Sequence, residues 1–414
     1  MLRILPLEEA QNFITRKAVR LAEAEQTVAP ILEAVRKRGD EAVLEYARRF
    51  DGLEGASFTV PESEWRAAEA LVSPEFRSAI QTAADNIREY AQLQLPADSW
   101  VQFTDGRRLG HVVRPLESMG AYIPAGRYPL PSTLLMTAIP AQVAGVKTIC
   151  AASPHPSPEI LATARYLDIS HVFRIGGAQA IAALAFGTAT IPKVDRIVGP
   201  GNIYVAAAKK LLAGEVGIDF VAGPTEIVII AEDADPRHIA ADMLAQAEHD
   251  VEASSILLTT SRALAEQVAT EVARQLETLP TAAVACQSIR NHSAAILCPS
   301  LDAAVEASNR LAPEHLALYD QSLLPKIQHA GSIFLGPTSP EAAGDYASGP
   351  NHVLPTSGAA RIRGGLSAAD FVKVISVQEL SANGLAQLAP AITTLARAEG
   401  LEAHARSVEV RLGK

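Results

Sequence analysis

A regular alternation of short apolar segments, glycine-containing turns and Ala-rich helical segments runs through the chain from about residue 111. This βαβα alternation predicts an α/β fold with a doubly wound parallel sheet, because parallel strands need a crossover connection and a helix supplies it. Hydrophobic residues make up 48% of the chain and aromatic residues only 5%, which suits Ala-rich helices packed on Val/Ile strands. The expected strands are 146–153, 171–177, 193–202, 226–232, 254–261, 293–300, 316–320 and 331–336.

The chain divides into more than one unit, because 414 residues exceed one ordinary domain and the alternation restarts after Gly223-Pro224. The helix that follows the restart is expected to have Asp235 as its cap and Pro236 at its first position. The predicted division has four parts. A mainly helical segment (1–110) leads into the first α/β unit (111–224), and the second α/β unit (225–366) is followed by a tail with two helices (367–414).

Charge and cysteine usage exclude several classes of protein. The formal net charge of −10 argues against a nucleic-acid-binding surface. The three cysteines show no CxxC spacing, so neither a disulfide framework nor a thiolate zinc site is expected. Cys150 and Cys298 lie in apolar, strand-like runs, where a thiol is expected to be inert. With acidic residues close to Met1 and no apolar run of about 18 residues, we expect a cytoplasmic protein.

Two pairs of polar residues could carry chemistry in the second unit. Gln246 and His249 are three apart in a predicted helix, so an amide oxygen and an imidazole share one face and could hold a metal ion. The alternative is a polar helix end. Glu314 and His315 stand beside an apolar strand, where histidine can take a proton near neutral pH and a buried glutamate can activate water. The alternative is a turn after Pro313 with a packed histidine.

Further candidates lie in a glycine-rich loop and in the last predicted helices. The loop contains Glu341, Asp345 and His352, and its small residues would let the backbone approach a ligand closely. An ordinary surface loop is the alternative. Glu399 and His404 stand in a terminal segment, and a solvated helix face is the ordinary interpretation of their spacing.

The glycine turns at 176–179 and 199–202 each follow a predicted strand and open a predicted helix. Such turns can direct backbone N–H groups and a helix N-terminus toward an anion, although close packing of helix on strand is the alternative. The dinucleotide-binding fingerprint G-x-G-x-x-G is absent, and so are the G-x-S-x-G elbow and the Walker loop. On their own, the turns indicate a ligand at the carboxyl edge of a sheet.

Taken together, eight motifs in fixed order resemble the histidinol dehydrogenase family. Between about residue 120 and residue 404 the matching segments are GAYIPAGRYPLPSTLLMTAIPAQVAGV, RIGGAQAIAALAFGT, VDRIVGPGNIYVAAAKK, DFVAGPTEIVII, QAEHD, NRLAPEHLAL, GDYASGPNHVLPT and EGLEAH. Each motif alone is weak, whereas the ordered set is specific, and the N-terminal helices fit as well. The resemblance implies two incomplete Rossmann-like units without the glycine fingerprint, which agrees with its absence here.

The resemblance also implies roles for individual residues. The implied zinc ligands are Gln246, His249, Asp345 and His404. The implied catalytic pair is Glu314 and His315, and the positions that would contact NAD are Tyr122, Gln179 and Asn202. Substrate would contact the four zinc ligands and His315, together with Thr225, Glu341, His352 and Glu399. At Thr225 the chain departs from the family's usual serine; the hydroxyl is kept, in a slightly tighter pocket.

The implied reaction is oxidation of L-histidinol to L-histidine by two NAD, through a bound aldehyde, as in histidine biosynthesis. One zinc per subunit would orient the substrate, and the resemblance implies a homodimer in which Glu399, His404 and His352 act on the partner subunit's substrate. A related dehydrogenase for another small alcohol, such as a sulfonated diol, would share most of these positions. A non-catalytic metal- or nucleotide-binding relative is the other alternative, and the intact Glu314-His315 pair argues against it.

Overall fold

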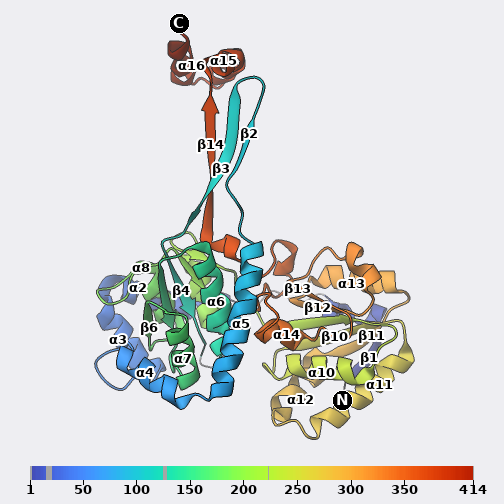
Figure 1. Cartoon of the computed structure of the whole chain (residues 1–414). Coiled ribbons are helices and arrows are strands. Elements are labelled where there is room, and N and C mark those ends of the chain that lie inside the picture. The colour runs from blue at the N-terminus through green and yellow to red at the C-terminus, as the bar shows by residue number, and fades with distance from the viewer. Residues whose placement is uncertain (1, 15–20, 125–127, 222, 414) are drawn as a thin grey trace.

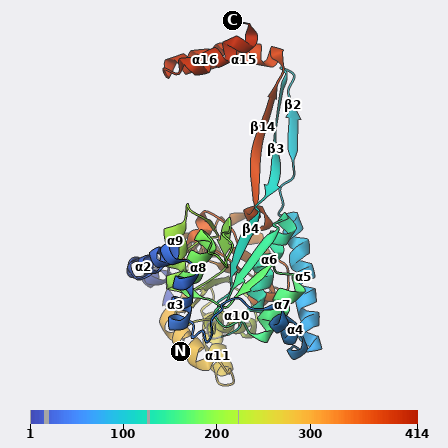
Figure 2. The same cartoon turned by 90° about the vertical axis from the view of Figure 1, so that its left-hand side faces the viewer.

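The computed structural model describes residues 2–14, 21–124, 128–221 and 223–413. Two α/β lobes lie side by side, and a narrow three-stranded arm leaves the first lobe and carries the C-terminal helices away from both (Figures 1 and 2). Residues 125–127 and 222, which belong to two of the family-like motifs, lie outside the described residues. Among the described helices, none combines the length and apolarity needed to cross a membrane.

The first lobe is built on a five-stranded parallel sheet in the order β6-β5-β4-β7-β8. Helices cover both of its faces, and each face has its own apolar core, which confirms the doubly wound arrangement. The elements are β4 (Ser118–Tyr122), α6 (Pro131–Ala144), β5 (Thr148–Ala152), α7 (Pro158–Tyr166), β6 (His171–Phe173), α8 (Gly177–Phe186), β7 (Arg196–Val198), α9 (Ile203–Leu212) and β8 (Gly217–Ile218).

The N-terminal helices complete the two faces of the first lobe. One group packs on α8 and α9, and the other packs on α6 and α7, so the segment is part of this lobe and not a separate domain. Ser73 caps the longest of these helices by accepting a hydrogen bond from the N–H of Phe76, with Pro74 at the first position. These helices are α2 (Ala22–Arg38), α3 (Asp40–Phe50), α4 (Glu62–Leu71) and α5 (Pro74–Leu93), whereas the short α1 (Gln11–Ile14) packs on the second lobe.

The second lobe contains a six-stranded parallel sheet in the order β1-β11-β10-β9-β12-β13. Its elements are β1 (Arg3–Pro6), β9 (Glu226–Ile230), α10 (Pro236–Ala247), β10 (Ser254–Thr259), α11 (Arg262–Leu276), α12 (Ala282–His292), β11 (Ala294–Leu297), α13 (Leu301–Leu311), β12 (His315–Leu318), β13 (Ser332–Leu335) and α14 (Glu341–Tyr346). As predicted, Asp235 caps α10 by accepting from the N–H of Arg237, and Pro236 is its first residue. This cap fixes the start of the helix that carries Gln246.

Two parts of the N-terminal segment differ from the prediction. The first strand, β1, pairs with β11 at the edge of the second lobe's sheet, so this N-terminal strand belongs to the second lobe and not to the first. The end of the segment is also extended and not helical: β2 (Ser99–Gln102) and β3 (Arg107–Pro115) form an antiparallel pair. The first difference is a pairing between segments far apart in sequence, and the second is a pair of strands at the end of a helical segment. Helical periodicity reveals neither.

The arm consists of β2, β3 and β14 (Val372–Leu380), and β14 pairs with β3 along nine residues. Beyond it, α15 (Ala382–Ala398) and α16 (Glu402–Glu409) pack on each other at the far end of the arm (Figure 2). The two terminal helices confirm the prediction for the tail, whereas β14 was not foreseen. Short 3-10 turns complete the structure at Leu7–Glu9, Gln321–Lys326, Ala359–Arg361, Ala368–Phe371 and Val410–Leu412.

Candidate active site

A cavity of about 900 Å³ lies between the two lobes. On the first lobe it is bordered by the turn that follows β7, at the carboxyl edge of the sheet. On the second lobe it is bordered by Thr225 and Glu314, which directly precede β9 and β12, so this wall is the amino edge of the sheet. Ligands of open α/β sheets usually lie outside carboxyl ends. Here only one lobe follows that rule, and the second lobe faces the cavity with the opposite edge.

Glu314 and His315 both line the cavity and are almost fully buried. His315 is the first residue of β12, whose central position between β9 and β13 holds the backbone rigidly. The Glu314 carboxylate accepts hydrogen bonds from the hydroxyl of Thr225 (2.5 Å) and the backbone N–H of Glu226 (2.9 Å). Burial raises the pKa of Glu314 to about 7, against the opposing effect of His315. A carboxyl group of this kind can exchange a proton with water near neutral pH.

The imidazole of His315 is held in one orientation by a backbone carbonyl. Its Nδ1 lies 3.2 Å from the backbone carbonyl of Glu226, which only accepts hydrogen bonds, so Nδ1 carries the proton. Its Nε2 has no hydrogen-bond partner among the described residues and lies 3.7 Å from the Asp345 carboxylate. Burial acts to lower the pKa of His315, but the carboxylates of Glu341, Glu314 and Asp345 outweigh it and raise that pKa to about 10.

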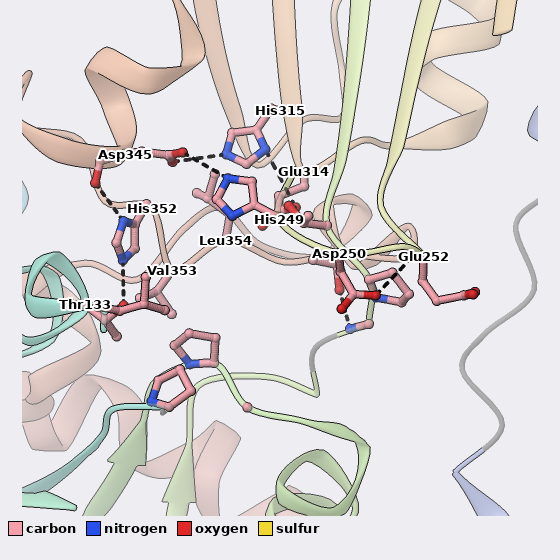
Figure 3. A pocket seen from close by; sticks show the side chains of 18 of the residues that line it. Thr133, His249, Asp250, Glu252, Glu314, His315, Asp345, His352, Val353 and Leu354 are labelled. Carbon is pink, nitrogen blue, oxygen red and sulfur yellow. Dashed lines mark hydrogen bonds and ion pairs between the residues drawn. The ribbon is translucent and has the colours of Figure 1, made fainter. Parts of the chain in front are cut away.

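Three imidazoles surround Asp345, two at its carboxylate and one at its backbone carbonyl, as Figure 3 shows. His249 Nε2 lies 3.8 Å from Asp345 Oδ2, and the Nδ1 of His352 donates to the backbone carbonyl of Asp345 at 2.8 Å. Burial acts to raise the pKa of Asp345, but the neighbouring histidines, above all His315, hold it below its ordinary value. The structure therefore brings together Asp345, His249, His315 and His352 at one wall of the cavity.

Gln246 lies behind this wall. It is fully buried, and its amide is best placed with the oxygen accepting from Glu226 N (3.0 Å), while its nitrogen donates to Glu341. Glu341 is also buried, 3.4 Å from His315 Nδ1, and burial raises its pKa well above its ordinary value. Helix α10 ends at Ala247, so His249 stands in the turn beyond it and not on the same helical face as Gln246, contrary to the prediction.

The structure does not bring the tail residues to this cavity. Glu399 caps the C-terminus of α15, His404 lies in α16, and both are exposed at the far end of the arm (Figure 1). Within the described residues of one chain, no group of three or more His, Cys, Asp or Glu side chains is placed to hold a metal ion. His249 and Asp345 face one another with suitable nitrogen and oxygen donors, but one chain offers an incomplete set.

The three positions expected to contact NAD lie along the carboxyl edge of the first lobe. Asn202 lines the cavity and caps α9, because its side-chain oxygen accepts from the N–H groups of Tyr204 and Val205. Tyr122 and Gln179 are buried just behind the cavity wall. The Tyr122 hydroxyl accepts from the N–H of Gly177 at 3.1 Å.

Buried carboxylates occupy the N–H groups that were expected to face an anion. Asp51 accepts from the N–H of Gly176 (2.9 Å) and from the Gln179 amide (3.0 Å). Asp219 accepts from the N–H of Gly199 at 2.8 Å. The first N–H group of each turn is therefore taken by a carboxylate of the chain itself. Sequence reasoning missed both residues: Asp51 lies outside the quoted motifs, and Asp219 opens the motif DFVAGPTEIVII but was given no role.

Another residue missed from the sequence is Thr133, in the first turn of α6. Its hydroxyl lies 3.3 Å from Nε2 of His352 and lines the same cavity. Because the Nδ1 of His352 donates to Asp345, the Thr133 hydroxyl is left as the donor to Nε2. One histidine thus links the first lobe to Asp345, which lies in helix α14 and not, as predicted, in a loop.

No cysteine takes part in the site, and we predict that thiol reagents leave the folded protein's function intact. Burial raises the pKa of Cys150 to about 12 and of Cys298 to about 11, and Cys286 does not line the cavity. Iodoacetamide should react slowly with the native chain, whereas all three thiols should react in urea, as mass spectrometry can count. Rapid inactivation that a bound ligand prevents would contradict this prediction.

Comparisons with known proteins agree with one another. The sequence profile of the family described as histidinol dehydrogenase matches residues 14–412. A histidinol dehydrogenase of Geobacter sulfurreducens is 50% identical over 402 residues, with 94% of each chain covered. One from Geobacillus kaustophilus is 48% identical over 402 residues, with 95% of each chain covered.

Solved structures extend the comparison to the fold. A crystal structure of histidinol dehydrogenase from Elizabethkingia anophelis has a TM-score of 0.95 and 40% sequence identity, and the match covers 100% of this chain and 98% of that one. An acetylating aldehyde dehydrogenase from Geobacillus thermoglucosidasius has a TM-score of 0.51 at 12% identity, over 90% and 94% of the two chains. The latter shows a similarity of fold alone.

Proposed function

The chain belongs to the histidinol dehydrogenase family, and from that premise we propose that it oxidises L-histidinol to L-histidine in two successive hydride transfers to NAD. The observation that carries the proposal is the Glu314-His315 pair on the cavity wall, where one imidazole nitrogen has no partner within the described residues. A proton acceptor and a water-activating carboxyl group side by side are what an alcohol oxidation followed by an aldehyde oxidation requires.

In the first step, His315 accepts the hydroxyl proton of histidinol while a hydride leaves the same carbon for NAD, which yields the aldehyde and NADH. The aldehyde stays in the cavity, and His315 releases the first proton to solvent before the second step. In the second step, Glu314 takes a proton from water as the water oxygen bonds to the aldehyde carbon. The hydrate then gives a proton to His315 and a hydride to a second NAD, leaving the carboxylate of histidine. The hydrogen bond from Nδ1 to the Glu226 carbonyl leaves Nε2 as the nitrogen that exchanges protons with the substrate in both steps.

We assign the zinc site of this account to His249 and Asp345, with Gln246 behind them and His404 of the partner subunit as the fourth ligand. The paired imidazole and carboxylate at 3.8 Å fit a zinc ion, which favours nitrogen and oxygen donors of this kind. Bound zinc would orient the substrate's nitrogen atoms, and its charge would lower the pKa of the nearby imidazole. Zinc itself undergoes no change of oxidation state.

The arm motivates the proposal that two chains share each site. Glu399 and His404 lie on the exposed terminal helices, remote from the cavity of their own chain (Figure 2). A homodimer that exchanges its arms would deliver these two residues to the partner subunit's cavity. We assign Thr225, Glu341 and His352 to the substrate's surroundings, and Tyr122, Gln179 and Asn202 to those of NAD. The cytoplasm, which supplies NAD and keeps thiols reduced, is the proposed location.

The direct test is NADH formation from histidinol, followed by absorbance, with and without a strong chelator. We expect two NADH for each histidinol consumed, at least about a hundredfold loss of rate after chelation, and recovery on adding zinc. A panel of other small alcohols, including a sulfonated diol, is the specificity control. Turnover of another alcohol in preference to histidinol, or one NADH per substrate, would contradict the proposal.

A further inference from the structure

Lys209 and Asp219 form an ion pair inside the first lobe that the mechanism above does not use. Their side chains are 3% and 0% exposed. Lys209 lies in α9, and Asp219 directly follows β8. Removing two charges from water is costly, and an apolar pair of similar volume often serves stability equally well. A buried ion pair therefore raises the question of what its charges hold in place.

Both charges hold Gly199. The Nζ of Lys209 donates to the carbonyl of Gly199 at 3.1 Å, and Oδ2 of Asp219 accepts from the N–H of Gly199 at 2.8 Å. Gly199 has φ +115°, and a Cβ on it would lie 2.2 Å from the carbonyl oxygen of Tyr122. The glycine is therefore gripped through both of its backbone groups and pressed against the end of β4. We call Lys209 and Asp219 the Gly199 clamp.

The clamp lies directly behind the cavity wall. Pro200, Gly201, Asn202 and Ile203, which follow Gly199, all line the cavity. Asp219 also accepts from the N–H of Phe220 at 2.7 Å, and Phe220 lines the cavity from the other side of the same ion pair. Two separate parts of the wall are thus anchored to one pair of charges.

We propose that Lys209 and Asp219 are positioning residues for the nucleotide: the clamp holds the 200–203 turn and Phe220 in the arrangement that receives NAD. The proposal rests on the proposed function, because it assumes that NAD binds at this edge of the first lobe. It requires no contact between the clamp and the nucleotide. The N–H group of Gly199 already donates to the Asp219 carboxylate and is not available to the nucleotide. In this proposal, that hydrogen bond serves instead to hold the shape of the turn.

The test uses a neutral pair so that no charge is left buried alone. In the Lys209→Met/Asp219→Asn chain, the donor to the Gly199 carbonyl is lost while an acceptor for its N–H remains. We expect the Kd for NADH, measured by fluorescence titration without histidinol or metal, to rise by on the order of tenfold, since small misplacements of binding groups are costly. The KM for histidinol should change less than about twofold and the melting temperature by a few degrees.

Two further variants make the test specific. Lys209→Gln/Asp219→Asn restores an N–H donor for the carbonyl and should recover most of the NADH affinity. Lys210→Met removes the neighbouring ion pair between Lys210 and Glu25 on the outside of α9 and should leave NADH binding unchanged.

A folded Met/Asn variant with the parent's NADH affinity would overturn the proposal. An equal rise in the Kd for NADH and the KM for histidinol would also overturn it, and so would failure of both neutral double variants to fold. Either result would show that the ion pair supports the fold in general and not the nucleotide site. If the parent itself binds no NADH, it is the proposed function that fails.

Discussion

Replacing Glu314 with glutamine is expected to slow oxidation of histidinaldehyde by about 10²- to 10³-fold, while histidinol oxidation slows by less than about tenfold. Glutamine keeps the shape of the side chain and can still accept from Thr225 and from the N–H of Glu226, which hold the carboxylate now. It cannot take a proton from water. Only the step in which water attacks the aldehyde should therefore suffer strongly.

The two half-reactions can be measured separately, with histidinol and with histidinaldehyde as the starting substrate in single-turnover experiments. Glu341→Gln is the matched control, because Glu341 lies against His315 but not on the cavity wall. That change should affect both half-reactions to a similar extent, through the imidazole that serves both. Equal losses in the two half-reactions of Glu314→Gln would reject the division of labour between Glu314 and His315.

The second large effect concerns the shared site. His315→Ala and His404→Ala should each lower activity by at least about 10³-fold as homodimers, the first by loss of the base and the second by loss of a metal ligand. Mixing the two chains should restore about a quarter of the parent activity, because random pairing makes half of the dimers mixed and each mixed dimer has one intact site.

Differently tagged chains allow the mixed dimers to be isolated and their formation to be proved. His404 is exposed and remote from both lobes, so its replacement should not disturb folding, which the melting temperature can verify. Mixing His404→Ala chains that carry the two tags is the control and should restore nothing. Isolated mixed dimers without activity would show that His404 does not complete the partner subunit's site.

Much of the fold could be predicted because its signals are local. Apolar runs, glycine turns and helix caps such as Asp235-Pro236 act within a few residues, and the two parallel sheets follow from their alternation. The adjacency of Glu314 and His315 is also local, so their meeting at one place was visible in the sequence. His249 was misplaced because the predicted helix ran past Ala247, where α10 ends, to include it. Errors of one or two residues are typical of helix ends.

The parts that could not be predicted depend on long-range pairing. β1 pairs in parallel with β11, almost three hundred positions later, and β14 pairs with β3 although strands and helices of both lobes lie between them in sequence. No periodicity reports which distant strand is the partner. In the same way, Asp51 accepts from the N–H of Gly176 at the start of α8 although it is remote in sequence and lies in none of the quoted motifs.

The account depends on a metal ion held jointly by two subunits, and anomalous X-ray diffraction from crystals grown with zinc tests this most directly. With data collected on either side of the zinc absorption edge, we expect one anomalous peak per cavity, bonded to His249 and Asp345 of one subunit and to His404 of the partner subunit. A peak held by one chain alone, or no peak at His249 and Asp345, would contradict the account.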